Sequence, residues 1–135
     1  MDYSMMVTVD TAYDDTVAAT REALADNGFG VLTEIDVRAT LKAKLDVDVP
    51  PQIILGACRP PLAHRAMQAD PSIATLLPCN VVVREVAEGC IVEAIDPTAM
   101  MSFAGESEAL ADVAEDASAR IRAALDSLTK AREAS

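Results

Sequence analysis

Aromatic residues are scarce in this sequence, and tryptophan is absent. Two tyrosines and two phenylalanines make up only 3% of the 135 residues. The hydrophobic core must therefore be built from Val, Ile, Leu, Ala and Met, and the hydrophobic fraction is 51%. A fraction this high argues against a disordered chain. The length is close to that of a common single domain, so we expect one domain over residues 1–135.

Basic residues are also few. Eleven Lys and Arg stand against 22 Asp and Glu, which gives a net charge of −11 and a pI of about 4.3. Nucleic acids and anionic membrane surfaces are bound through clustered basic side chains, so we expect neither as a partner. The acidic balance fits a salt-adapted cytoplasm, where salt screens the self-repulsion, as well as it fits an ordinary acidic bacterial or archaeal protein.

Long hydrophobic runs and secretion signals are missing as well. The first residues, MDYSMMVTVD, contain neither a basic region nor a long apolar stretch, and no run approaches the length of a membrane span. The three cysteines, Cys58, Cys79 and Cys90, are an odd number without a secretory signal. This favours free thiols in a reducing cytosol, and we expect a soluble cytoplasmic protein.

The hydrophobic pattern predicts short alternating elements. Strands are expected at 3–9, Gly30–Asp36 and Gln52–Cys58, followed by a hairpin over 80–96. Helices are expected after Thr11 (in a capping box with Asp14), Asp36 and Pro60-Pro61, and a long amphipathic helix over 106–131. The order β-α-β-α-β-α-β-β-α indicates an α+β fold of two layers, with helices packed on a single mixed or antiparallel sheet.

A two-residue turn at Glu88-Gly89 would fix the register of the hairpin. It would place Val86 opposite Ile91, Arg84 opposite Glu93 and Val82 opposite Ile95, which gives two apolar pairs and an opposite-charge pair on one face. The alternative is a bulged three-residue loop, because Glu-Gly is a weaker turn signal than Asn-Gly.

Residues 53–83 contain most of the side chains that could take part in catalysis or ligand binding. Cys58 ends a predicted buried strand, Arg59 precedes a predicted helix, and His64 lies one turn into that helix. A helix N-terminus and a nearby cation both favour a thiolate, as a nucleophile, redox centre or soft-metal ligand requires. The competing interpretation makes Cys58 a small core residue and His64 a packing or surface residue.

The direction of the next strand decides whether Cys79 lies near Cys58. An antiparallel arrangement brings the two cysteines together, a parallel crossover separates them, and we favour the antiparallel one. Cys90 would lie far from both, beside the hairpin turn. Arg59 and Arg65 could hold an anion at the helix start or pair with surface acids. The cysteine spacing does not match a zinc site, so no metal ligands are assigned, and no cofactor can be named.

Three stretches of the chain resemble a known family. GFGVLTEIDVRATLKAKL, ILGACRPPLAHRAMQADPSIATLLPCNVVV and IVEAIDPTAMM are similar to the domain-of-unknown-function family numbered 302. The resemblance implies a compact α+β domain that pairs as a homodimer, and it implies no established reaction. Its signature falls on Gly56, Cys58, Pro60, Pro61, Leu62, Asp70, Pro71, Pro78, Cys79, Asn80, Asp96, Pro97 and Met100.

Three functions fit these observations. The first is a homodimeric module that binds a small molecule near Cys58, Cys79 and Asn80, with Gly56, Arg59 and His64 as further ligand contacts. The second is a thiol-based redox or sulfur-handling enzyme with Cys58 and Cys79 as catalytic residues, or a site where the same thiols bind a soft metal or haem. The third is a structural interaction domain whose cysteines belong to the core.

Overall fold

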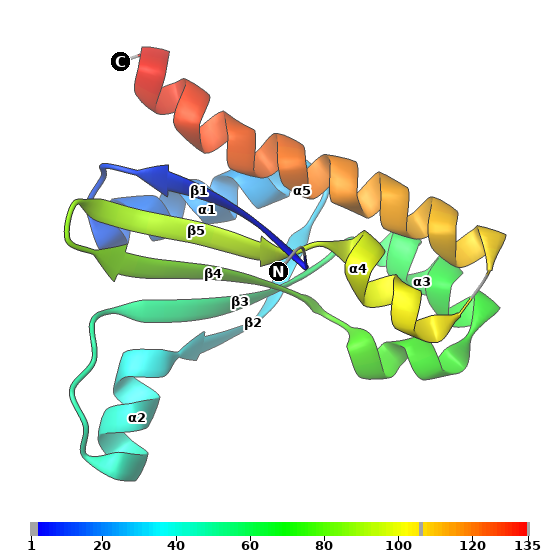
Figure 1. Cartoon of the computed structure of the whole chain (residues 1–135), viewed down its shortest axis with the longest axis horizontal. Coiled ribbons are helices and arrows are strands. Elements are labelled where there is room, and N and C mark those ends of the chain that lie inside the picture. The colour runs from blue at the N-terminus through cyan, green and yellow to red at the C-terminus, as the bar shows by residue number, and fades with distance from the viewer. Residues whose placement is uncertain (1–2, 106, 135) are drawn as a thin grey trace.

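A computed structural model describes residues 3–105 and 107–134 of the chain (Figure 1). Its strands are β1 (Ser4–Val9), β2 (Gly30–Asp36), β3 (Gln52–Cys58), β4 (Cys79–Val86) and β5 (Gly89–Ile95). Its helices are α1 (Tyr13–Asp26), α2 (Val37–Leu45), α3 (Pro60–Ala69), α4 (Pro97–Met101) and α5 (Glu108–Ala134), with 3₁₀ turns η1 (Pro71–Leu76) and η2 (Ser102–Ala104).

The five strands form one sheet in the order β1-β5-β4-β3-β2, and all neighbouring strands are antiparallel. The predicted α+β class is confirmed, and the sheet is antiparallel throughout. The predicted order of elements was incomplete, because the short helix α4 between β5 and α5 was missed. Its start is encoded locally: Asp96 accepts a hydrogen bond from the backbone N–H of Thr98, and Pro97 occupies the first helical turn.

One face of the sheet carries the core. Helix α5 packs against β1, α1, α3 and α4, and α1 lies against β2, β4 and β5. Alternate strand residues point toward these helices, so Leu55, Val81, Val83 and Val92 are fully buried. As expected from the shortage of aromatics, Phe29 is the only aromatic side chain in the buried core of the described residues.

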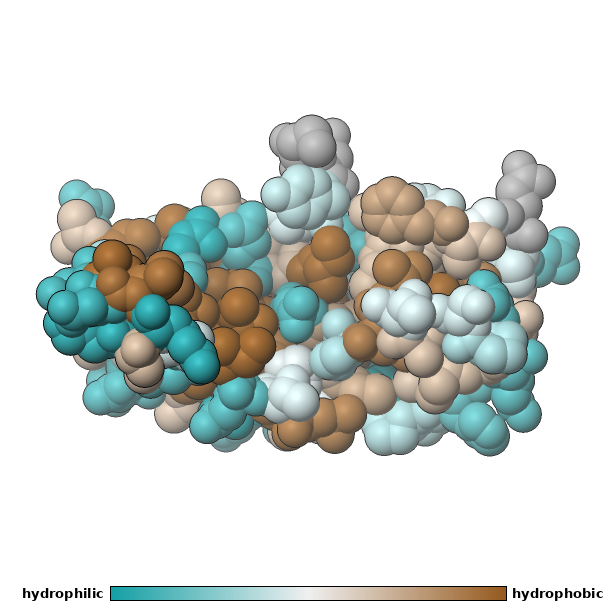
Figure 2. Space-filling view, turned by 90° about the horizontal axis from the view of Figure 1, so that it is seen from below, coloured by the Kyte–Doolittle hydropathy of each residue, from teal (hydrophilic) through white to brown (hydrophobic). Residues whose placement is uncertain are grey.

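The other face of the sheet is largely open. In Figure 1 the strands lie in front of α1, so this face points toward the viewer. Met6 and Ile35 are exposed there at 52% and 49%, and Leu32, at the irregularity in β2, is 65% exposed. Helix α2, next to this face, has no buried residue. Figure 2 looks instead at the lower side of this view, where hydrophobic side chains gather beside α2 and in the middle of the surface.

The predicted N-caps of α2 and α1 can be compared with the hydrogen bonds in the structure. The cap of α2 is confirmed, because Asp36 Oδ1 accepts a 2.9 Å hydrogen bond from the backbone N–H of Ala39. The capping box at Thr11 was wrong: Ala12 is the N-cap of α1, without a side-chain cap. The Thr11 hydroxyl instead lies 2.6 Å from the hydroxyl of Thr16, which is itself buried.

The hairpin register was wrong by two residues. The turn falls at Ala87-Glu88, so Arg84 lies opposite Ile91 and Val82 opposite Glu93. Gly89 serves a close approach to β1 and not the turn, because a Cβ there would collide with the carbonyl oxygen of Val9. A shift by two keeps every side chain on its face. Arg84 Nη1 and Glu93 Oε1 therefore still meet at 2.8 Å, along a diagonal.

Helix α5 extends the predicted C-terminal helix to Ala134. Residue 106, where that helix was expected to begin, lies outside the described residues. None of the described helices has the length and apolar character needed to cross a bilayer.

Candidate functional site

The strands that carry Cys58 and Cys79 are neighbours. β3 and β4 pair antiparallel with Ala57 opposite Cys79, so the end of β3 lies beside the start of β4. Cys58 follows Ala57 in β3 and is therefore one residue away from the position opposite Cys79. It is half-buried at the end of its strand, whereas Cys79 is buried. The antiparallel arrangement favoured by the sequence is therefore present, and all three cysteines are free thiols.

Cys58 and Cys79 both line a small cavity between the sheet and the helices. The cavity has a volume of about 30 Å³, and its wall includes Arg59, Leu62 and Met101. A water molecule needs roughly 10–15 Å³ of such volume, so the cavity holds about two groups of that size. Apart from Arg59 and the two thiols, the named wall residues are apolar.

The environment of the two thiols keeps them protonated. Burial raises the pKa of Cys58, and burial together with the nearby Cys58 raises the pKa of Cys79 to about 11. The start of α3 does not offset this with hydrogen bonds. Pro60 and Pro61 lack N–H groups, and the amides of Leu62 and Ala63 both donate to the carbonyl oxygen of Arg59. The expected thiolate-stabilising helix start therefore supplies no free amide.

Arg59 is the polar side chain at the cavity wall. Its Nε is fully buried and has no hydrogen-bond partner among the described residues. It lies beside Gly28, where an added Cβ would be 2.9 Å from Arg59 Nε and 3.7 Å from Arg120 Nη1. Arg120 is paired with Asp116, whereas no carboxylate of the described part of the chain is paired with Arg59. Two guanidinium groups thus flank Gly28, and one of them lacks a counter-charge.

The remaining predicted ligand contacts do not share the cavity. Gly56 and Asn80 lie opposite each other in the sheet. Their neighbours Ala57 and Cys79 face the helices, so by strand alternation Gly56 and Asn80 face the open side. His64 is exposed on α3. The residues proposed from sequence are therefore divided by the sheet into an inner group (Cys58, Arg59, Cys79) and an outer group (Gly56, Asn80).

Cys90 is separate from both groups, as expected. It is fully buried in β5, opposite Glu85, and its thiol donates a 3.6 Å hydrogen bond to the carbonyl oxygen of Thr11. Within the described residues, no three His, Cys, Asp or Glu side chains are arranged to hold a metal ion.

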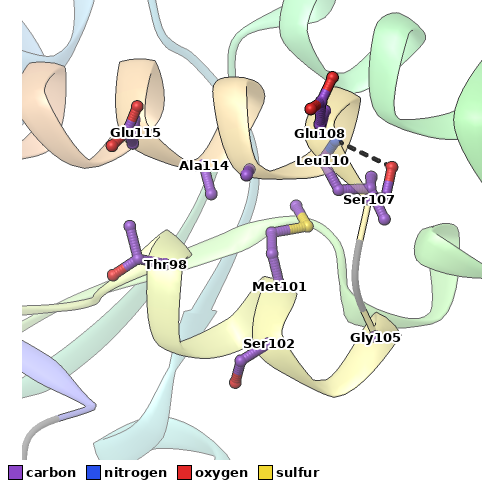
Figure 3. Close-up of a pocket in the computed structure, with 10 residues that line it drawn as sticks. Thr98, Met101, Ser102, Gly105, Ser107, Glu108, Leu110, Ala114 and Glu115 are labelled. Carbon is purple, nitrogen blue, oxygen red and sulfur yellow. Dashed lines mark hydrogen bonds between the residues drawn. The ribbon is translucent and has the colours of Figure 1, made fainter.

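A larger cleft lies between α4 and the first turns of α5 (Figure 3). Its volume is about 560 Å³, and it is lined in part by Thr98, Met101 and Ala114. Sequence reasoning missed it because α4 was missed. The Asp96-Pro97 pair, a cap followed by a first-turn proline, was the local signal that could have indicated this helix.

Comparison with known proteins agrees with the resemblance seen in the motifs. The family described as Domain of unknown function DUF302 matches residues 5–128. A crystal structure of an uncharacterized conserved protein DUF302 from Bacillus stearothermophilus is similar over 93% of this chain and 98% of that chain, with a TM-score of 0.85 and 29% identity. No curated protein matches the chain.

Proposed function

This chain belongs to the DUF302 family of domains of unknown function, and from that premise we propose that it is a homodimeric module that binds a compact anionic group, such as a carboxylate, in the cavity beside Cys58 and Cys79. The family description names no reaction, so the proposal rests on the chemistry of this cavity.

The observation that carries the proposal is the state of Arg59. A buried guanidinium N–H without an acceptor is costly, and removing the acceptor of a buried donor costs about 1–3 kcal/mol. A bound carboxylate would provide both the acceptor and the counter-charge at Arg59, which lines the cavity.

The size of the cavity limits what can occupy it. A volume of about 30 Å³ suits the head of a carboxylate but not a whole metabolite, because pockets for drug-sized ligands are roughly 300–1,000 Å³. The apolar wall at Leu62 would contact the carbon that bears the carboxylate. In this arrangement Cys58 and Cys79 act as polarizable wall residues in the protonated state.

The thiol-enzyme hypothesis receives less support from this site. A catalytic thiol requires a lowered pKa, and the pKa values of both Cys58 and Cys79 are raised. The site also offers no histidine, because His64 is not among the cavity residues.

Calorimetric titration with acetate and propanoate, in about 0.15 M chloride, tests the proposal. Wild-type protein should bind propanoate but not the neutral analogue propanamide. Arg59→Gln should weaken propanoate binding at least tenfold, because a charge-assisted hydrogen bond contributes about 1.5–3 kcal/mol. The matched control is Arg65→Gln, which alters an exposed arginine of α3 and should bind like wild type. Equal binding of propanoate by the Arg59 and Arg65 variants would refute the anion site.

The open face of the sheet supports the homodimer. Met6 and Ile35 are exposed on it, and the two charged side chains Arg84 and Glu93 form an ion pair there. Two copies that each carry a net charge of −11 repel one another, so they can approach most easily through a face without net charge. Met6 and Ile35 lie at opposite edges of this face, in one row across the sheet with Glu93, Val82 and Ile54. Exposed apolar surface on a sheet face marks an interaction site when it forms a patch.

Sedimentation equilibrium tests the dimer. The wild-type chain should sediment as a dimer, and Ile35→Asp should shift it toward the monomer because the charge would be placed within the apolar face. Met67→Asp is the matched control: it places the same charge at an exposed methionine of α3, 38% exposed, and should leave the dimer intact. A monomeric wild-type protein would refute this part of the proposal.

A further inference from the structure

We propose that the thiol cavity and the α4–α5 cleft are two parts of one elongated binding site separated by Met101, and that this site takes a straight-chain carboxylate, with its head at Arg59 and its tail in the cleft. The inference rests on the proposed function, because the head is bound in the cavity described above, and it adds the class of ligand.

Met101 is the residue that connects the two spaces. It lines both the cavity of about 30 Å³ and the cleft of about 560 Å³. It is 6% exposed and lies on α4, which packs against α5. An unbranched thioether side chain with three rotatable bonds adapts to irregular spaces more readily than a branched or aromatic one. A change of its rotamer would open a continuous path from Arg59 to the cleft.

The interior of the cleft is apolar. Figure 3 shows Met101 and Ala114 pointing toward each other across the space between α4 and α5. Leu110 and Ala114 are only 3% and 2% exposed, so they form the buried floor. This apolar floor suits a hydrocarbon tail, while the exposed Glu108 and Glu115 also line the cleft.

The hydroxyl groups that line the cleft form hydrogen bonds with nearby residues of the protein. Thr98 donates to Asp96 Oδ1 at 2.8 Å and Ser102 donates to the carbonyl oxygen of Ala99 at 2.6 Å. Ser107 Oγ accepts from the backbone N–H of Leu110 at 3.4 Å. The hydroxyl hydrogens of Thr98 and Ser102 are therefore used within the protein, so these two groups offer a ligand only acceptor lone pairs.

A series of sodium carboxylates from acetate to decanoate, kept below their micelle concentrations, tests the inference by calorimetric titration at about 0.15 M chloride. Once the chain is long enough to pass Met101, each added methylene buried in the cleft should tighten binding about fourfold. Ala111→Leu fills the cleft from an exposed position of α5, so it should remove this gain for octanoate and leave propanoate binding unchanged.

Two further variants complete the design. Met101→Ala should strengthen octanoate binding relative to propanoate, because it removes the barrier between the two spaces. Ala123→Leu is the matched control, an exposed alanine of α5 outside the cleft, and should reproduce the wild-type series. If affinity does not rise with chain length, or if Ala111→Leu keeps the full gain for octanoate, the elongated site is refuted, whereas propanoate binding that depends on Arg59 would still support the proposed function. Failure of every carboxylate to bind would refute both.

Discussion

Replacing Gly56 with alanine tests the claim that this residue serves packing and is not a ligand contact. An added Cβ would point to the open face of the sheet, 2.8 Å from Pro78 Cγ and inside contact distance of the Thr33 hydroxyl oxygen. Gly56 is not in a left-handed conformation, so the cost comes from crowding alone. Overpacking costs about 1–3 kcal/mol, partly offset by about 0.4–1 kcal/mol from the stiffer unfolded chain.

We therefore expect Gly56→Ala to lower the free energy of unfolding by about 1–2 kcal/mol. For a chain of this size the midpoint of thermal unfolding should fall by about 4–8 °C. Urea denaturation followed by circular dichroism measures the free energy directly. Binding of propanoate should stay at the wild-type level when corrected for the folded fraction, because Gly56 and Arg59 lie on different sides of the sheet.

Two additional variants make this test specific. In Gly30→Ala the new Cβ would be 3.9 Å from its nearest neighbour, the carbonyl oxygen of Cys58, so this matched control should be neutral or slightly stabilising. Combining Thr33→Ala with Gly56→Ala should recover part of the loss, with a coupling of about 1 kcal/mol, while the contact with Pro78 remains. If Gly56→Ala were as stable as Gly30→Ala, the crowding argument would be wrong.

Three shorter tests address the thiols, the open face and a helix cap. With a pKa of about 11, only about one Cys79 in 3,000 is a thiolate at pH 7.5. Iodoacetamide should therefore alkylate Cys79 at least 100-fold more slowly in the native state than in urea, which mass spectrometry can measure. Equal alkylation rates in the two states would contradict this. Hydrogen bonds from Ser4 and Arg84 lower the pKa of Glu93. Its contribution to stability is therefore present above the unfolded-state pKa near 4.3 and is lost as pH falls through the lower folded-state pKa. Glu93→Gln should cost more stability at pH 7 than at pH 3, and an equal cost at both pH values would contradict this. Asp36→Ala removes the α2 cap and should cost about 1 kcal/mol in urea denaturation, and an unchanged midpoint would show that the cap does not stabilise the fold.

The sequence by itself determined most of the elements. The strands Gly30–Asp36 and Gln52–Cys58 were predicted with their observed bounds, and the cap at Asp36 was identified. These features depend on signals within a few residues, such as apolar runs, capping side chains and prolines, which act regardless of what packs against them. The antiparallel pairing of β3 and β4 was also favoured from the sequence, and the structure has it.

The tertiary structure decided the register of the hairpin and the composition of the site. Gly89 contacts β1, which is distant in sequence, so no local signal revealed that it avoids a collision and does not form the turn. The division of Gly56 and Asn80 from Cys79 follows from strand alternation once the register is known. The position of Met101 between two spaces depends on how α4 packs on α5, and the missing partner of Arg59 depends on which groups the whole fold brings near it. Such contacts between distant segments are set by the global packing of the chain, which its local patterns do not specify.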